Sequence, residues 1–365
     1  MTVPGPASLV IDEPIPRIRQ RSGKVRGDTI TLAHGSGGKA MRDLIDDVFV
    51  GAFNNPSLAP LEDQARFTLS ELVGHGDRLA FTTDSYVVDP LFFAGGNIGD
   101  LAVNGTVNDL AVSGARALYL SCAVILEEGF AVADLRRIVD SMQQAARVAG
   151  VQIVTGDTKV VERGAVDKLF INTSGIGVIP AGVNIAATRA RPGDKVLVNG
   201  YIGDHGVAIL AARDDLALDV PIQSDCQPLH GLIATLLKAC PDVHCLRDAT
   251  RGGIATVLNE FAQAANVCVN LDEPTIPVRE AVKGVSEILG LDPLYFANEG
   301  KLVAVIPAEY AELALTAMRA HPAGADAAII GEISESPVGC VIMHTAFGGE
   351  RIVDMLIGEQ LPRIC

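Results

Sequence analysis

The stretch that decides the fold reads RALYLSCAVILEEGFAVADLRRIVDSMQQAARVAGVQIV and spans residues 116–154. Its first part, 116–126, is an apolar run that predicts a β-strand. Residues 133–150 repeat apolar residues at helical spacing and stop at Gly150, which predicts an amphipathic helix. The apolar face of that helix consists of Leu135, Ile138, Met142, Ala145 and Ala149. A further strand is expected at 151–154, so the stretch indicates an α/β fold.

The same alternation of apolar runs and amphipathic segments continues on both sides of this stretch. Toward the N-terminus we expect strands at 29–32 (TITL), 65–72 (ARFTLSEL) and 78–83 (RLAFTT), and helices at 41–49 and 98–114. A strand at 169–179 (LFINTSGIGVI) closes this half of the chain.

A domain linker is expected at residues 189–194, RARPGD, because Pro192 and Gly193 interrupt regular structure. Beyond it the sequence predicts strands at 195–198, 268–271, 301–306, 327–331 and 339–344, and helices at 231–240 and 254–265. We therefore expect an N-terminal domain at 29–188 and a C-terminal domain at 189–355. Residues 1–28, which are rich in proline and basic side chains, predict a disordered extended arm, and 356–365 predict a mobile tail.

The charge balance excludes some classes of partner. With 44 acidic and 29 basic residues the formal net charge is -15, which disfavours nucleic acid and anionic membranes. The N-terminus lacks the apolar core of a secretory signal, and we find no uncharged apolar run long enough to span a membrane. Seven scattered cysteines fit reduced thiols. The expectation is a cytoplasmic protein.

A glycine-rich loop, HGSGGK at 34–39, lies between an expected strand and an expected helix. The backbone N–H groups of Gly37 and Gly38, with Lys39, are suited to phosphate. The loop is not a Walker A motif, because position 33 is alanine and Ala40 has no hydroxyl for a metal ion. A plain flexible turn is the alternative.

Aspartates follow several apolar runs. Such residues usually cap helices or turns, but several in similar positions suggest converging carboxylates, the ligands that Mg²⁺ prefers when it also binds phosphate. The set comprises Asp63, Asp84, Asp109, Asp157 and Asp248.

Three further segments could contribute to a nucleotide site. Asn104 and Asn108 lie one turn apart in an otherwise apolar helix. They could form the wall of a nucleotide pocket, and the alternative is a solvated face. Arg251 and Gly252 open a predicted helix in RDATRGG and could contact phosphate. Glu299, in NEGK, could place another carboxylate near the same cleft.

The last four residues of the sequence are Pro362-Arg363-Ile364-Cys365. Cys365 could act as a swinging nucleophile or carrier, although an accidental terminal cysteine is the alternative. A zinc site is not expected, since the spacing of the cysteines and histidines in 226–245 matches no common finger. The residues concerned are Cys226, His230, Cys240, His244 and Cys245.

Taken together, these motifs closely resemble the HypE family of hydrogenase maturation proteins, in the superfamily of aminoimidazole ribonucleotide synthetase and selenophosphate synthetase. From about residue 29 onward, HGSGGK, TTDSYVVDPLFF, NGTVNDLAVSGA, VTGDTKVV, GYIGDHG, RDATRGG, ANEGK and PRIC stand in order. The resemblance implies an N-terminal α/β domain that pairs in a homodimer and a C-terminal α+β domain that closes over ATP.

The resemblance also implies a reaction. A carbamoyltransferase, HypF, would load a carbamoyl group onto Cys365, ATP would drive dehydration of the S-carboxamide to a thiocyanate, and a HypC–HypD complex would accept the cyanide for the iron of a [NiFe] hydrogenase. Glu299 and Lys159 would be the dehydration pair. The five aspartates would hold Mg-ATP. ATP contacts would come from Gly37, Gly38, Lys39, Asn104, Asn108, Gly156, Thr158, Arg251 and Gly252.

Two alternatives remain. A small-molecule kinase or selenophosphate synthetase of the same superfamily would share the aspartates but would have no use for Cys365. A non-enzymatic ATP-binding scaffold would use the tail only for docking and would tolerate Cys365→Ser.

Overall fold

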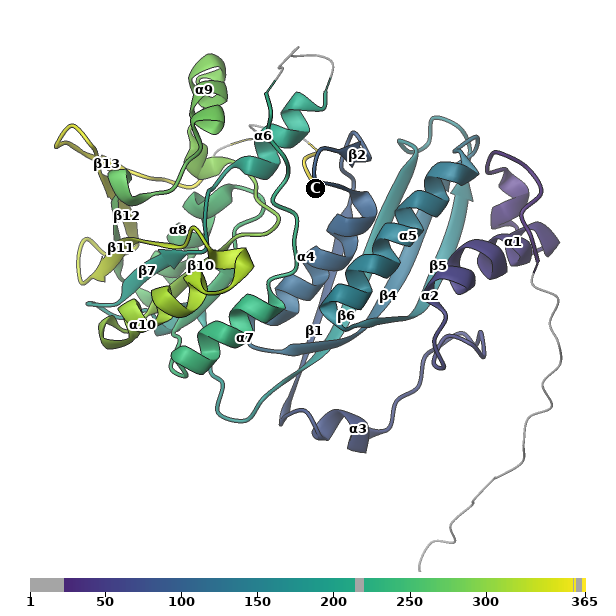
Figure 1. The fold of residues 1–365 in the computed structure, drawn as a ribbon, viewed down its shortest axis with the longest axis horizontal. Helices are drawn as coiled ribbons and strands as arrows, with labels where there is room; N and C mark the ends of the chain where they lie inside the picture. Colours follow the sequence, from purple (N-terminus) through teal and green to yellow (C-terminus); the bar gives the residue numbers. More distant parts are fainter. Residues whose placement is uncertain (1–22, 214–219, 357, 359–362) are drawn as a thin grey trace, which may run out of the picture.

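The computed structural model describes residues 23–213, 220–356, 358 and 363–365. A sheet of four strands and a sheet of seven strands form the two halves of the molecule (Figure 1). A small ladder joins β2 (Phe92–Phe93) to β3 (Gly96–Asn97). The predicted N-terminal arm lies outside the described residues except for 23–28, and the predicted tail is described at 356, 358 and 363–365.

The N-terminal sheet has the strand order β1-β6-β4-β5. Its strands are β1 (Arg78–Tyr86), β4 (Arg116–Glu127), β5 (Gln152–Val161) and β6 (Leu169–Ile179). β4 and β5 are parallel and are joined by α5 (Val132–Ala149), whereas the other pairs are antiparallel. The strand, helix and strand predicted within residues 116–154 are confirmed.

Helices cover one face of this sheet (Figure 1). They are α5 and α4 (Ile98–Val112), which pack on each other. The opposite face carries exposed apolar side chains: Leu79, Phe81 and Ile125 are 61%, 72% and 39% exposed. They alternate with residues that face the helices, such as Thr82, which bonds Asp109 of α4.

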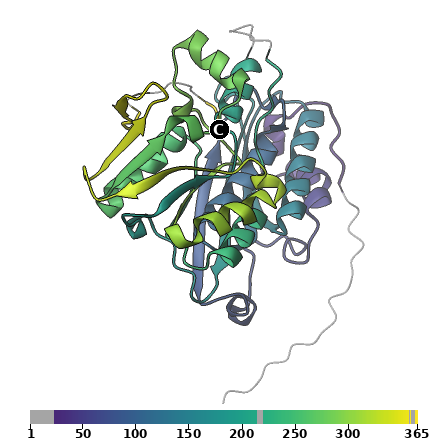
Figure 2. The same cartoon turned by 60° about the vertical axis from the view of Figure 1, so that its left-hand side comes forward.

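The C-terminal sheet has the order β13-β12-β9-β11-β7-β10-β8, with β12 and β9 parallel and the other pairs antiparallel. α8 (Gly253–Ala265) packs on one face, and α7 (His230–Ala239) and α10 (Ala308–Arg319) pack on the other (Figure 2). The strands are β7 (Lys195–Val198), β8 (Cys245–Asp248), β9 (Cys268–Asp272), β10 (Leu302–Ile306), β11 (Ala328–Ser334), β12 (Cys340–His344) and β13 (Glu350–Ile352).

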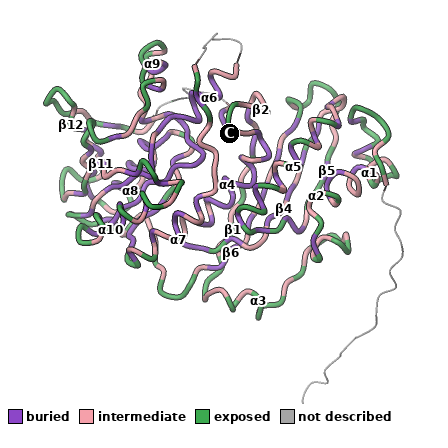
Figure 3. Tube along the Cα trace, viewed as in Figure 1, coloured by how far each residue is buried: buried purple, intermediate pink, exposed green. Residues whose placement is uncertain are grey.

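α4 joins the two halves. It contacts β1 and β6 on one side and α7 and β8 on the other, and most of its residues are buried (Figure 3). A helix that is buried on several sides needs no single apolar face. This explains why α4 is not clearly amphipathic. Asn104 and Asn108 of α4 contact residues of the C-terminal half, whereas Thr106 bonds Thr173 of β6. The C-terminus also lies at the boundary between the halves (Figures 1 and 2).

Two predicted strands are wrong. Residues 29–32 form only one β-bridge, from Thr29 to Ala131, because the chain turns into a 3-10 helix at Leu32–Gly35. Residues 65–72 include the start of α3 (Leu69–Val73), where the Thr68 N–H donates to Glu71 Oε2 at 3.0 Å. A Thr-x-x-Glu sequence is a helix-start signal, and here it prevails over the alternating pattern.

The remaining predicted elements are confirmed within a few residues. The expected helix at 41–49 becomes α1 (Lys39–Leu44), a π-helical turn (Ile45–Val50) and α2 (Gly51–Phe53). The helices α6 (Asp204–Ala211) and α9 (Glu280–Leu289) were not predicted. Among the described residues, no helix combines the length and hydropathy that crossing a bilayer requires.

Candidate active site

The tail places Cys365 beside the start of α8. Cys365 and Ile364 are buried, and Arg251 Nε donates to Cys365 Sγ at 3.2 Å. Burial raises the pKa of Cys365 to about 12, although Arg251 opposes the shift. The thiol is therefore protonated in this position. It borders a cavity of about 590 Å³ whose lining includes Asp84, Arg251 and Gly252.

Gly252 shapes the turn that presents Arg251. Its φ is +74°, in the left-handed region, and a Cβ there would lie 2.1 Å from Thr256 Oγ1. Glycine is the residue that takes this conformation at little cost. The RDATRGG sequence thus allows α8 to begin with Arg251 directed toward the tail.

A second cavity, of about 750 Å³, adjoins the first at Arg251 and is lined by Asp109 and Asp248. Burial and then repulsion from Asp109 raise the pKa of Asp248, and burial together with Asp84 raises the pKa of Asp109. These carboxylates come from β1, α4 and β8. Their mutual repulsion identifies a place where a cation would be favourable.

The acidic group could hold Mg²⁺ only together with ligands from outside the protein. Within the described part of the chain, no three acidic, histidine or cysteine side chains are arranged to hold a metal ion. Mg²⁺ in phosphate-binding sites typically takes one or two carboxylates and completes its shell with phosphate oxygens and water. The Asp84, Asp109 and Asp248 group suits that arrangement.

Glu299 is buried near the thiol. Burial and then the carboxylate of Asp225 raise the pKa of Glu299 well above its usual range. Its Oε1 has no hydrogen-bond partner and lies 4.0 Å from His205 Nε2. An unpaired buried carboxylate is costly, which is typical of a group kept for chemistry.

The two predicted asparagines differ in their surroundings. Asn108 Nδ2 donates to the backbone oxygens of Gln227 and Glu299 at 3.1 and 3.2 Å, and its Oδ1 accepts from Leu229 N at 2.7 Å. Asn108 therefore supports the Glu299 loop. Asn104 Nδ2 lies 3.5 Å from Cys226 Sγ, and its buried Oδ1 has no partner.

The other predicted residues lie at the opposite edge of the N-terminal sheet. Asp157 and Lys159 are on β5 and form an ion pair of 3.0 Å with side chains 56% and 63% exposed. Asp84 is on β1, three strands away, or roughly 14 Å at ordinary strand spacing. Thr158 is buried, so its neighbours Asp157 and Lys159 point to the open face.

The glycine-rich loop belongs to this second group of residues. Asp63, Gly156, Asp157 and Thr158 line a cavity of about 450 Å³ that also contacts α1. Lys39, next to Gly37 and Gly38, pairs with Asp43 at 2.6 Å. One chain thus brings Cys365, Arg251, Glu299 and three aspartates together, but it does not bring Lys159 to Glu299 or Asp63 and Asp157 to the other aspartates.

Other residues of the site were missed from the sequence. His205 Nε2 lies 2.8 Å from the Ile364 carbonyl oxygen, and Asp225 bonds the Glu299 loop. GYIGDHG is one of the motifs that carry the resemblance, but nothing in it assigns His205 a role. Asp225 lies in an irregular loop without any periodic signal. The cysteines and histidines considered for zinc form no metal-binding group among the described residues.

Comparisons with known proteins place this geometry in context. The family model "AIR synthase related protein, N-terminal domain" matches residues 62–179, and its C-terminal counterpart matches 191–344. Carbamoyl dehydratase HypE of Rhodobacter capsulatus is 59% identical over 341 residues, covering 93% of this chain and 99% of that protein.

Two solved structures are also similar. A hydrogenase maturation protein HypE in complex with ATP has a TM-score of 0.87 at 50% identity, covering 92% of this chain and all of that one. A HypE–HypF complex has a TM-score of 0.74 at 50% identity, covering 86% of this chain and 99% of that one.

Proposed function

This chain belongs to the HypE family of carbamoyl dehydratases, and from that premise we propose that it dehydrates an S-carboxamide on its own Cys365 to a thiocyanate at the expense of ATP. The product would supply the cyanide ligand for the iron of a [NiFe] hydrogenase. The observation that carries the proposal is the buried contact between Cys365 Sγ and Arg251 Nε in a cavity next to Glu299 and the aspartates.

The chemistry requires the amide oxygen to leave. Transfer of the ATP γ-phosphoryl group to that oxygen turns it into phosphate, a good leaving group. The nitrogen loses two protons, one to a base and one to the departing phosphate, while the C–O bond breaks and the C≡N triple bond forms. The net change is loss of one water from the tail, with ATP converted to ADP and phosphate.

Two side chains of this site suit those steps. Arg251 would hold its donors toward the sulfur and the transferred phosphate, since guanidinium groups bind phosphate well. In its ionised form Glu299 would accept a nitrogen proton, because its Oε1 has no other partner and the raised pKa makes that form a stronger base. The surrounding burial would exclude water.

ATP and magnesium would occupy the neighbouring cavity. Asp84, Asp109 and Asp248 would hold Mg²⁺ together with phosphate oxygens, and that ion would offset the charge on the transferred group. Arg251 lines both cavities, and we propose that it contacts the γ-phosphate.

The remaining predicted ligands would come from a second copy of the chain. Asp157 and Lys159 point to the open face of the sheet, where Leu79, Phe81 and Ile125 are exposed. A two-fold pairing of these faces would cover the apolar patch, and it could bring β5 of one copy toward β1 of the other. Lys39, Asp63, Gly156, Asp157 and Lys159 would then complete the Mg-ATP and dehydration site of the partner, whereas the buried side chain of Thr158 would only hold β5 in place.

Phe81→Arg should disrupt this homodimer, because dimerisation would bury the unpaired charge of the arginine in an apolar interface. We expect a monomer in light scattering at micromolar concentration and weaker ATP binding by calorimetry. Leu313→Arg, at a 55% exposed position on α10, is the matched control and should stay dimeric. A Phe81→Arg protein that remains dimeric would refute the pairing of these faces.

The tail chemistry also implies partners. A relative of this chain has been solved in a complex with HypF, and we propose a HypF-type carbamoyltransferase as the donor to Cys365. A HypC–HypD iron scaffold would accept the cyanide. We also propose that the reaction takes place in the cytoplasm.

Mass spectrometry of the intact protein and its tail peptide tests the reaction. The chain is incubated with the carbamoyl donor system, with and without Mg-ATP. We expect a carbamoyl adduct on Cys365 that loses one water only when Mg-ATP is present. An unmodified Cys365 beside an active donor enzyme and bound ATP would favour a small-molecule kinase or a scaffold instead.

A further inference from the structure

The last three residues of the tail are held through their main-chain carbonyls. Val87 N donates to the Cys365 oxygen and Asp89 N to the Arg363 oxygen, both at 3.2 Å. Between them, the Ile364 oxygen lies 2.8 Å from His205 Nε2. Val87 and Asp89 follow β1, whereas His205 belongs to α6, so both halves of the molecule hold the tail.

The contacts of the His205 ring define its protonation. A carbonyl oxygen can only accept a hydrogen bond, so Nε2 carries the hydrogen. Nδ1 lies 2.8 Å from Ser224 Oγ and accepts from that hydroxyl. Burial lowers the pKa of His205, which keeps the ring neutral. With an edge-on contact to Phe93 at 5.6 Å, the ring has a fixed orientation.

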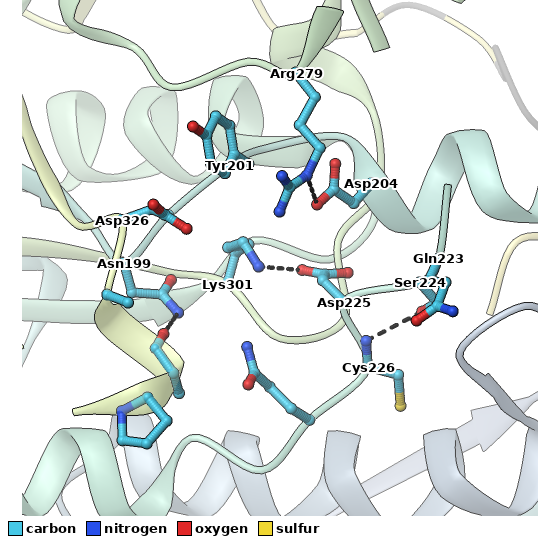
Figure 4. Close-up of a pocket in the computed structure, with 15 residues that line it drawn as sticks. Asn199, Tyr201, Asp204, Gln223, Ser224, Asp225, Cys226, Arg279, Lys301 and Asp326 are labelled. Atoms are coloured by element: carbon cyan, nitrogen blue, oxygen red, sulfur yellow. Dashed lines mark hydrogen bonds and ion pairs between the residues drawn. The ribbon is translucent and has the colours of Figure 1, made fainter. Parts of the chain in front are cut away.

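His205 and Glu299 are both tied to one short segment, the 223–227 loop. Ser224 fixes the ring, and Asp225 accepts from Glu299 N at 3.0 Å, Gly300 N at 3.2 Å and Lys301 Nζ at 2.9 Å. The loop lines a cavity of about 320 Å³ together with Lys301, and the ion pair of Asp225 with Lys301 lies in it (Figure 4). Polar contacts therefore define where the loop sits.

We propose that His205 is a positioning residue, which binds the Ile364 carbonyl and so keeps the group carried by Cys365 beside Glu299 and Arg251. This inference rests on the proposed function and adds to it a residue that acts through the tail. The 223–227 loop gives the tail anchor and the Glu299 loop a common support, so that the sulfur and the base keep a fixed separation.

The expected size of the effect follows from one hydrogen bond. Loss of the donor leaves the Ile364 carbonyl buried and unpaired. The ratio of docked to undocked tail should then fall about tenfold. A Gln side chain can place an amide N–H near the position of Nε2, whereas Asn reaches only as far as Nδ1. His205→Gln should therefore preserve the tail contact, and His205→Asn and His205→Leu should lose it.

The first measurement needs no carbamoyl chemistry. The full chain is mixed with iodoacetamide in the presence of Mg-ATP, and alkylation of Cys365 is followed by mass spectrometry. We expect His205→Leu and His205→Asn to react about tenfold faster than the wild type, with His205→Gln close to the wild type. If His205→Leu fails to fold, the comparison of Gln with Asn still decides the result.

The second measurement follows dehydration of the carbamoylated tail in a single turnover. His205→Asn should acquire the carbamoyl group and bind ATP as the wild type does, but lose water about tenfold more slowly. Equal alkylation rates in the wild type, Gln and Asn proteins would overturn the positioning role. A wild-type tail that never loses water would overturn the proposed function, and alkylation would still test His205.

Discussion

Cys365→Ala is expected to carry no carbamoyl group and to abolish hydrogenase maturation, while ATP binding is retained. In the structure the thiol touches Arg251, and in the proposed reaction it carries the carbamoyl group. Removing one thiol contact costs about 1 kcal/mol, so the fold should persist. The measurements are intact mass after incubation with the donor system, calorimetry with ATP, and hydrogenase activity in a complemented deletion strain.

Cys340→Ala is the matched control for this variant. Cys340 lies on β12, and its thiol bonds only the nearby Val338 oxygen among the described contacts. The Cys340→Ala protein should acquire the carbamoyl adduct on Cys365 and should support hydrogenase maturation as the wild type does. Hydrogenase maturation by Cys365→Ala at the wild-type level would reject the carrier role and favour a scaffold.

Glu299→Gln is expected to bind ATP and to acquire the carbamoyl adduct, yet to convert it about 10²–10⁴-fold more slowly. The amide has nearly the same shape as the carboxyl group, so the burial of residue 299 and its loop contacts should be kept. It cannot accept the nitrogen proton. The measurement is the rate of water loss from the carbamoylated tail in a single turnover with Mg-ATP.

Glu335→Gln provides the control for the Glu299 variant, because Glu335 is an exposed carboxylate between β11 and β12. Its conversion rate should equal that of the wild type. Normal turnover in Glu299→Gln would show that another group is the base, with Lys159 of a second copy as the next residue to change.

Much of the fold could be predicted because local and tertiary signals agreed. Residues 116–154 have apolar runs of strand length around a helix with one apolar face, and each element forms as expected. The strand predicted at 65–72 is wrong because the Thr68 to Glu71 cap outweighs the alternating pattern. α6 was missed since its buried helix has no polar face to create a period.

The candidate site was predictable in its residue types but not in its grouping. The aspartates look alike in the sequence, yet Asp84 and Asp157 belong to opposite edges of one sheet, and strand order cannot be read from local motifs. His205 and Asp225 act through the main chain of other residues. Such contacts depend on which segments meet in space, so a lone histidine or aspartate gives no signal of them.

The buried, protonated state of the Cys365 thiol has a consequence for its chemical lifetime. Thiolates, rather than thiols, react with peroxides and electrophiles, and a pKa of about 12 leaves almost no thiolate at neutral pH. While the tail is docked, the sulfur is thus shielded from oxidation as well as from stray alkylation. Oxidative damage to Cys365 should then depend on the time that the tail spends undocked.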